Sequence, residues 1–203
     1  GDCEIMAVFN KEVPACNFAQ SPCQVALAAA QQIADGDSIK AIHLSTYDAA
    51  LNYPGCNYRG PFETPLQARM SIFFGMGAAM ARGEIAEANY ALLDDPRIAE
   101  LIDMTAVSIS DELNSAFPAR QGARVRIETA AGAVIEEALD DIRSASPALV
   151  RERLSRVAKV RLGAGQAGDL DGAINHLSGG GNDAASLAAV AKLAAAQAGE
   201  GVP

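Results

Sequence analysis

The periodicity of this 203-residue chain changes at residues 144–147, which read Ser-Ala-Ser-Pro. Before this point, strand-like alternation of apolar and polar residues recurs between helical stretches, as at residues 39–47. Beyond it no strand pattern is present. The change predicts an α+β domain over residues 1–145, followed by a helical segment over residues 146–203.

The first part of the chain has the pattern of a β-α-β unit. Residues 4–9 (Glu-Ile-Met-Ala-Val-Phe) resemble a short strand. Ser21, followed by Pro22, has the arrangement of a helix N-cap with proline at the first helical position. This helix is expected to reach Ala34, and the alternating strand over residues 39–47 completes the unit.

A long loop over residues 52–63 separates this unit from a buried helix. The loop contains two prolines and two glycines, and its length favours a functional role. From Thr64, a good N-cap, a helix is predicted to run to Ala81, with apolar residues around most of its circumference. Further along we expect helices at 85–92 and 96–104, a strand at 105–110 and a hairpin within 124–139. Together these elements predict a two-layer sandwich with a mixed sheet and helices on one side.

Three helices are expected in the C-terminal segment, at residues 147–161, 169–177 and 183–197. Glycine-rich links at 163–165 and 179–181 separate them. Each end helix has an apolar face that needs a covering surface, either on the sheet domain or on a second chain. Val150, Leu154 and Val157 form the first of these faces, and Leu187, Val190 and Leu193 form the last.

Composition excludes several classes of function. A net charge of −9 and an isoelectric point near 4.7 argue against nucleic-acid binding, which needs a basic face. No apolar run is long enough to span a membrane. The four cysteines lack metal-ligand spacing, and neither histidine has a partner at such spacing, so no metal is expected. Reduced thiols in the cytoplasm are the simplest interpretation. The first residues carry neither an initiator methionine nor a signal peptide, which suggests a cleaved product or an artificial start.

Two segments carry a family resemblance. Residues 11–18 read K-E-V-P-A-C-N-F, and residues 64–74 read T-P-L-Q-A-R-M-S-I-F-F. In this order they resemble the MmgE/PrpD family, whose second domain opens with K-x-[YF]-P-x-[CH] and later carries T-x-x-x-A-[KQR]-[FY]-S-[LI]. The hairpin, R-V-R-I-E-T-A-A-G at 124–132, is similar to the family's V-x-[VI]-x-x-x-D-G with alanine in place of aspartate.

The resemblance implies an activity and an organisation. The family includes 2-methylcitrate dehydratases, cis-aconitate decarboxylases and iminodisuccinate epimerases, which need no cofactor. Because the chain begins where the family's second domain begins, the resemblance implies that the helical first domain, with most of the catalytic residues, is missing. The expected partners are therefore a small polycarboxylate, and either that first domain or further copies of this chain, with no nucleic acid and no membrane.

Five residues carry the expected chemistry. The resemblance makes Lys11 and Cys16 candidates for catalysis, and Arg69, Ser71 and Gln20 candidates for substrate binding. Cations that hold carboxylates and groups that pass protons are what dehydration, decarboxylation or epimerisation of such acids requires. If the site is inherited, the side chains of Lys11, Arg69 and Ser71 should converge on one concave surface, with Cys16 and Gln20 at its edge.

Structural roles remain open for each candidate. Lys11 could be an ordinary lysine at a strand end, Cys16 a small buried hydrophobe, and Arg69 the ion-pair partner of Glu63. Two departures from the family pattern also stand out: Glu12 replaces the usual proline, and Gln20, which cannot shuttle protons, replaces a frequent histidine. The sequence therefore leaves two hypotheses, the second-domain portion of a lyase or isomerase and a non-catalytic binding or assembly module that keeps the fold.

Overall fold

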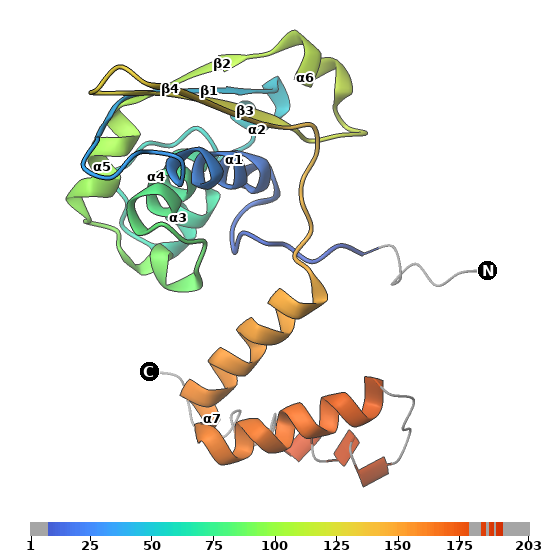
Figure 1. Ribbon diagram of the computed structural model, residues 1–203. Helices are drawn as coiled ribbons and strands as arrows, with labels where there is room; N and C mark the ends of the chain where they lie inside the picture. Colours follow the sequence, from blue (N-terminus) through green and yellow to red (C-terminus); the bar gives the residue numbers. More distant parts are fainter. Residues whose placement is uncertain (1–7, 179–183, 186, 189, 193–203) are drawn as a thin grey trace. The chain divides into compact units, whose positions relative to one another are not determined.

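The structure is a computed structural model, which describes residues 8–178, 184–185, 187–188 and 190–192 (Figure 1). The chain divides into two compact units, residues 1–144 and 145–203. Among the described residues, none of the helices is long and apolar enough to cross a membrane.

The first unit is built on a four-stranded sheet with the order β2-β1-β3-β4. Strand β1 pairs in parallel with β2 and antiparallel with β3, and β3 and β4 form an antiparallel hairpin. The sheet is therefore mixed, as predicted. The four strands are β1 (Ile39–Thr46), β2 (Thr105–Ile109), β3 (Ala123–Thr129) and β4 (Val134–Leu139).

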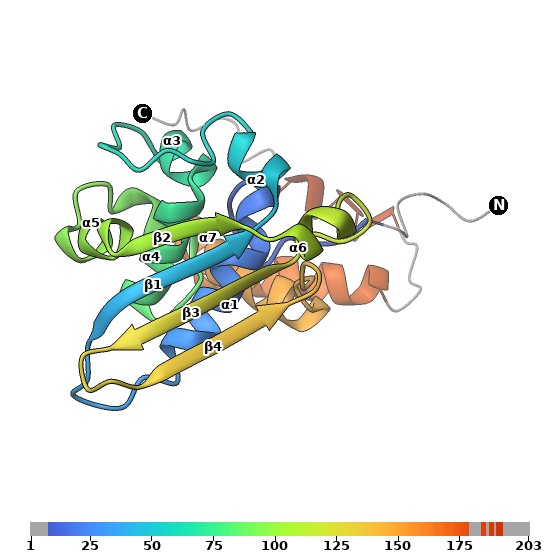
Figure 2. The same cartoon turned by 90° about the horizontal axis from the view of Figure 1, so that it is seen from above.

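Helices α1, α3, α4 and α5 form a layer on one face of this sheet, which Figure 1 shows edge-on and Figure 2 from above. Ile42 and Leu44 of β1 are buried, as their alternation predicted, and belong to the same hydrophobic core as the buried apolar residues of α4. The α+β fold with helices on one side is confirmed. The helical elements of this unit are the 3₁₀ turns η2 (Asn17–Ala19) and η3 (Glu87–Ala91), and α1 (Gln20–Ala30), α2 (Asp48–Asn52), α3 (Pro65–Met70), α4 (Ile72–Arg82), α5 (Pro96–Asp103) and α6 (Asp111–Ala116).

The N-terminal part differs from the predicted β-α-β unit. Of the expected strand over residues 4–9, residues 4–7 lie outside the described part, and Val8 and Phe9 belong to no strand. Lys11 instead forms an isolated antiparallel bridge with Ser144. The parallel neighbour of β1 is β2, so the crossover runs forward along the chain through α2 to α5.

Helix α1 also begins earlier than its proline suggested. It follows η2 directly, and its N-cap position is Ala19, with no side-chain cap. Ser21 lies inside the helix and donates its hydroxyl to the carbonyl oxygen of Gln121 at 2.7 Å. The preceding 3₁₀ turn already supplies backbone partners, so a capping side chain is not needed there.

The prediction of a single helix over residues 64–81 is wrong, because the helix is interrupted at Ser71. Thr64 caps α3 as expected, within a capping box completed by Gln67. Ser71 has extended backbone angles, ends α3, and accepts a hydrogen bond from the Phe74 amide as the N-cap of α4. Serine is a strong N-cap residue, and here this preference prevails over the continuous apolar pattern.

Other elements agree with the sequence pattern to within a few residues. Asp95 caps α5, and the strand after it and the hairpin are present as predicted. The helix predicted at 85–92 is a 3₁₀ turn, and the short helices α2 and α6 were not predicted. Helices of five or six residues show too little periodicity to be recognised.

The second unit contains α7 (Pro147–Ser178), which is interrupted at Gly163. Gly163 has a φ of 80°, a conformation that glycine adopts without a steric penalty. The interruption separates the two helices that the sequence predicted there. The third predicted helix, over residues 183–197, falls largely outside the described residues.

Candidate functional site

Lys11 lies on the surface at the start of the loop that leads into α1. Its backbone pairs with Ser144, and its ammonium group donates a hydrogen bond to the carbonyl oxygen of Ala15 at 3.2 Å. The side chain therefore lies along the loop toward Cys16. There its positive charge helps to lower the pKa of the Cys16 thiol.

Cys16 occupies the N-cap position of η2, immediately before the helical run over residues 17–30. Its sulfur lies 3.7 Å from the sulfur of Cys56. The contact with Cys56, the backbone N–H groups of Phe18 and Asn17 and the charge of Lys11 outweigh burial and lower the pKa of Cys16 from 9.0 to about 6. The surroundings of Cys16 therefore favour its thiolate form.

Gln20 supports the loop from behind. It is 0% exposed, and its amide oxygen accepts the Val13 N–H at 3.0 Å. Its amide nitrogen donates to the Val13 carbonyl oxygen at 2.8 Å and more weakly to those of Ala15 and Cys16. Both ends of the amide are thus used inside the chain, and they fix the turn that carries Cys16.

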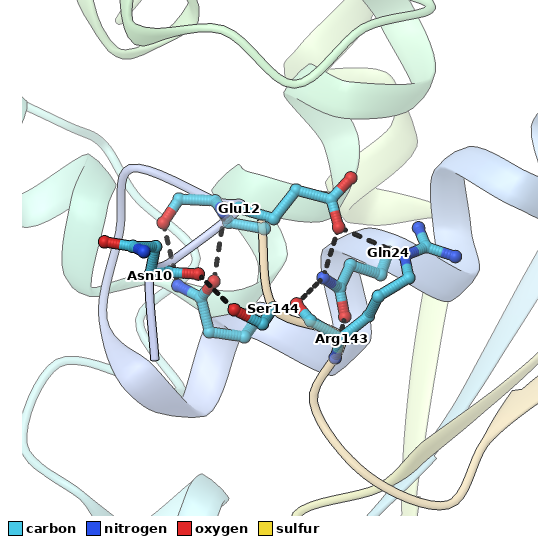
Figure 3. A network of polar contacts seen from close by, with 7 residues as sticks. Asn10, Glu12, Gln24, Arg143 and Ser144 are labelled. Carbon is cyan, nitrogen blue, oxygen red and sulfur yellow. Dashed lines mark hydrogen bonds and ion pairs between the residues drawn. The ribbon is translucent and has the colours of Figure 1, made fainter. Parts of the chain in front are cut away.

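Glu12, which departs from the family pattern, belongs to a polar network that anchors the same loop (Figure 3). Its carboxylate accepts from the Gln24 side chain at 2.6 Å and from Arg143 at 3.1 Å. Gln24 in turn exchanges hydrogen bonds with the Arg143 backbone, and Ser144 donates to the Asn10 carbonyl oxygen. This network joins residues 10–12 to α1 and to the chain after β4, and so holds the backbone on either side of Lys11.

Arg69 contacts the loop that carries Cys16 through its backbone. Its carbonyl oxygen accepts the Cys16 N–H at 2.9 Å. Its guanidinium pairs with Glu87 of η3 and lies 5.7 Å from the ring centroid of Tyr90. The partner is thus Glu87, whereas the structural alternative weighed from the sequence was Glu63.

Ser71 is 0% exposed, and its hydroxyl is used twice inside the chain. It donates to the Tyr58 carbonyl oxygen at 2.5 Å and accepts from the Phe74 amide at 3.0 Å. These two bonds join the loop over residues 52–63 to the start of α4. Because the hydroxyl has only one proton, a carboxylate could accept a hydrogen bond from Ser71 only by replacing the bond to Tyr58.

The structure brings Lys11 and Cys16 together and attaches Arg69 to them through its backbone. Gln20 and Ser71 lie buried next to this place and are bonded within the chain. Sequence reasoning missed Cys56, since forty residues separate it from Cys16. The loop over residues 52–63, singled out for its length, is the segment that contains it.

Aromatic side chains surround the head of α1. The ring of Phe18 packs against those of Tyr47, Tyr53 and Phe117. Tyr53 also lines a hollow between the loop at 51–58 and α3, together with Leu66 and Met70. Through Tyr53, the aromatic cluster around Phe18 reaches this hollow.

Arg59 and His43 are bonded within the chain. Arg59 lies 3.7 Å from the ring centroid of Phe73 and donates to the carbonyl oxygens of Ile102 and Thr105. His43 contacts the Ser108 hydroxyl on the sheet. Among the described residues, no group of three or more His, Cys, Asp or Glu could hold a metal ion.

Comparison with known proteins gives one family. The family model described as the MmgE/PrpD C-terminal domain matches residues 13–166, which include Cys16 and the helices α1 to α6. The match begins two residues after Lys11. No curated protein matches the chain.

Proposed function

Since this chain belongs to the MmgE/PrpD family, we propose that it forms the C-terminal part of a cofactor-independent lyase or isomerase. The proposed substrate is a small di- or tricarboxylate of the 2-methylcitrate type. The observation that carries the proposal is that the Lys11 ammonium, bonded to the Ala15 carbonyl oxygen just before Cys16, helps to lower the pKa of the Cys16 thiol.

In this proposal Lys11 and Cys16 are the catalytic residues. The Lys11 ammonium holds a substrate carboxylate and stabilises the negative charge that grows on it during the reaction. Cys16, whose pKa lies near neutrality, passes a proton to or from the substrate carbon or leaving group. Backbone N–H groups at the start of the helical run add attraction for an anion.

Arg69 is the proposed substrate-binding cation. Its side chain is about one-third exposed and is paired with Glu87 on the surface, a type of ion pair that contributes little stability. The guanidinium can therefore exchange Glu87 for a substrate carboxylate at small cost. The sequence predicted that Gln20 and Ser71 bind substrate. In this proposal they instead hold the backbone around the site in place through buried hydrogen bonds.

The proposal also includes a partner. The family's helical first domain, present in the same polypeptide or supplied by another chain, would contribute the remaining proton-transfer groups, and further copies of the chain would assemble around it. A reducing compartment such as the cytosol fits the described cysteines, which are free thiols. The net charge of −9 argues against nucleic acid as a partner.

An activity assay tests the reaction class. We expect no turnover of 2-methylcitrate or cis-aconitate by the 203-residue chain alone, and turnover when it is fused to a helical first domain of a family member. In the fusion, Lys11→Ala should lower kcat/KM by about 100-fold or more, the usual effect of losing a catalytic proton-transfer or charge-stabilising group. Lys40→Ala, at an exposed lysine of β1, is the matched control and should have no effect.

A non-catalytic binding or assembly module is the second candidate. The observation that favours it is the burial of Gln20 where many relatives carry histidine, which removes one group able to transfer protons. Such a module would bind the same carboxylates without converting them. A fused chain that binds substrate but shows no turnover with either acid would favour this candidate.

A further inference from the structure

Two thiols that are far apart in sequence meet beside the candidate site. Cys16 precedes α1, and Cys56 lies in the loop after α2, yet their sulfur atoms are 3.7 Å apart. Cys16 is partly exposed, whereas Cys56 is 0% exposed. An oxidant arriving from solvent therefore meets Cys16 first and finds the second thiol directly behind it.

Backbone contacts hold the two thiols in place. The Cys16 N–H donates to the Arg69 carbonyl oxygen at 2.9 Å, and the Cys56 carbonyl oxygen accepts from the Ile72 N–H at 3.0 Å. Both cysteines are thus attached to the junction between α3 and α4. A disulfide needs its sulfur atoms about 2 Å apart, so a short approach of two already anchored side chains would close the bond.

We propose that Cys16 and Cys56 form a peroxide-reactive thiol pair, in which Cys16 is oxidised first and Cys56 then closes a disulfide. The oxidant is a hydroperoxide, either hydrogen peroxide or an organic one. This inference goes beyond the proposed function and does not depend on it.

The reaction has two steps. The Cys16 thiolate attacks the terminal hydroxyl oxygen of the hydroperoxide, a sulfur–oxygen bond forms and the O–O bond breaks. The leaving alkoxide or hydroxide takes a proton from solvent and departs as alcohol or water, and Cys16 is left as a sulfenic acid. The sulfur is oxidised by two electrons and the peroxide is reduced. The Cys56 sulfur then attacks the Cys16 sulfenic acid, the disulfide forms, and the hydroxyl group leaves as water with the Cys56 proton.

The electrostatics around the pair favour this order. The contact with Cys56, backbone N–H groups and the Lys11 charge lower the pKa of Cys16 to about 6, so the thiolate form is favoured near neutral pH. Contact with Cys16 and burial raise the pKa of Cys56, which therefore stays protonated and does not compete for the oxidant. Once Cys16 is sulfenic acid, its negative charge is gone and Cys56 ionises more readily.

Cys23 provides an internal control. It is 0% exposed, lies in α1 against Gly75, and burial alone raises its pKa. A thiol in this environment has little thiolate and no route for an oxidant. We expect Cys23 to remain reduced under conditions that oxidise Cys16 completely.

The test uses the full chain carrying Cys3→Ser, because Cys3 lies outside the described residues and would complicate the thiol count. The protein is treated with hydrogen peroxide at pH 7, denatured, titrated for thiols and mapped by mass spectrometry. Of the three remaining thiols, two should be lost and one should survive. The disulfide should join Cys16 to Cys56 and should disappear on treatment with dithiothreitol.

Variants separate the two steps. Cys56→Ser should stop at the Cys16 sulfenic acid, which dimedone traps, whereas Cys16→Ser should leave Cys56 reduced at least about tenfold longer. Cys23→Ser is the matched control and should not alter the disulfide.

The proposal is overturned if all three thiols stay reduced while a free cysteine peptide is oxidised, or if mapping finds only bonds between chains or bonds to Cys23. Because mapping of the Cys3→Ser chain alone decides the outcome, a variant that fails to fold does not obscure it.

Discussion

At the scale of single residues, Cys16 shows how a short loop sets the chemistry of a side chain. Three kinds of neighbour stabilise its thiolate: the Cys56 thiol, two backbone N–H groups and the Lys11 ammonium. The sequence pattern could place Lys11 and Cys16 on one loop. It could not supply Cys56, because a contact between residues forty apart depends on the packing of a second loop.

The pKa of Cys16 can be measured through its reactivity. Since only the thiolate reacts, the rate of alkylation by iodoacetamide should rise with pH, with a midpoint near 6. Cys56→Ala removes the contact that lowers the pKa of Cys16 most, so it should move the midpoint upward toward the ordinary value of 9.0. Lys11→Ala should move it in the same direction by a smaller amount. A wild-type midpoint above 8 would contradict this description.

We expect Gln20 to contribute to the stability of the folded chain. Gln20→Ala leaves the buried Val13 N–H and carbonyl without their partner, which should lower the free energy of unfolding by about 2–3 kcal/mol. Gln31→Ala, at the exposed C-cap of the same helix, should change it by less than about 0.5 kcal/mol. Urea unfolding followed by circular dichroism measures both. Equal effects of the two substitutions would argue against the supporting role of Gln20.

At the scale of elements, local signals identified most of the sheet and failed where a polar side chain ended a helix. The alternation in β1 and β3 follows directly from one buried face, and it could be recognised in the sequence. The break between α3 and α4 was not. Ser71 is surrounded by apolar residues, and only the fold provides the Tyr58 carbonyl that its hydroxyl meets. Val8 and Phe9, the described end of the predicted N-terminal strand, belong to no strand for a similar reason, since strand pairing needs a partner that the local pattern does not reveal.

The contact between α1 and α4 gives a prediction at this scale. A Cβ atom on Gly75 would lie 2.6 Å from the Cys23 sulfur, closer than packed atoms allow. Gly75→Ala should therefore lower the stability by about 1–2 kcal/mol, even though alanine favours a helix more than glycine does. Gly172→Ala, at a helical glycine with open space around its Cβ position, should not be destabilising.

A double-mutant cycle identifies the cause. If the clash with the Cys23 sulfur is responsible, Cys23→Ala should remove most of the cost of Gly75→Ala, with a coupling of at least about 1 kcal/mol. Thermal and urea unfolding of the four proteins measure this coupling. Strictly additive effects would mean that the two helices are not in contact at this point.

At the scale of the whole molecule, the change of pattern at residues 144–147 falls at the border between the two compact units. The family match extends past this border to residue 166, so part of α7 belongs to the family's domain. The sequence also identified the family from two short segments. It could not assign roles to the residues in and beside them, because the burial of Gln20 and Ser71 results from packing that neither segment encodes by itself.

The central claim is that Lys11 and the head of α1 bind a small carboxylate. Titration of cis-aconitate into the ¹⁵N-labelled chain, followed by amide chemical shifts, tests it directly. We expect saturable shifts at Lys11, Cys16, Asn17 and Phe18, a Kd at least about tenfold weaker in Lys11→Ala, and an unchanged Kd in Lys40→Ala. Shifts that map elsewhere, or equal affinity in all three proteins, would contradict the claim.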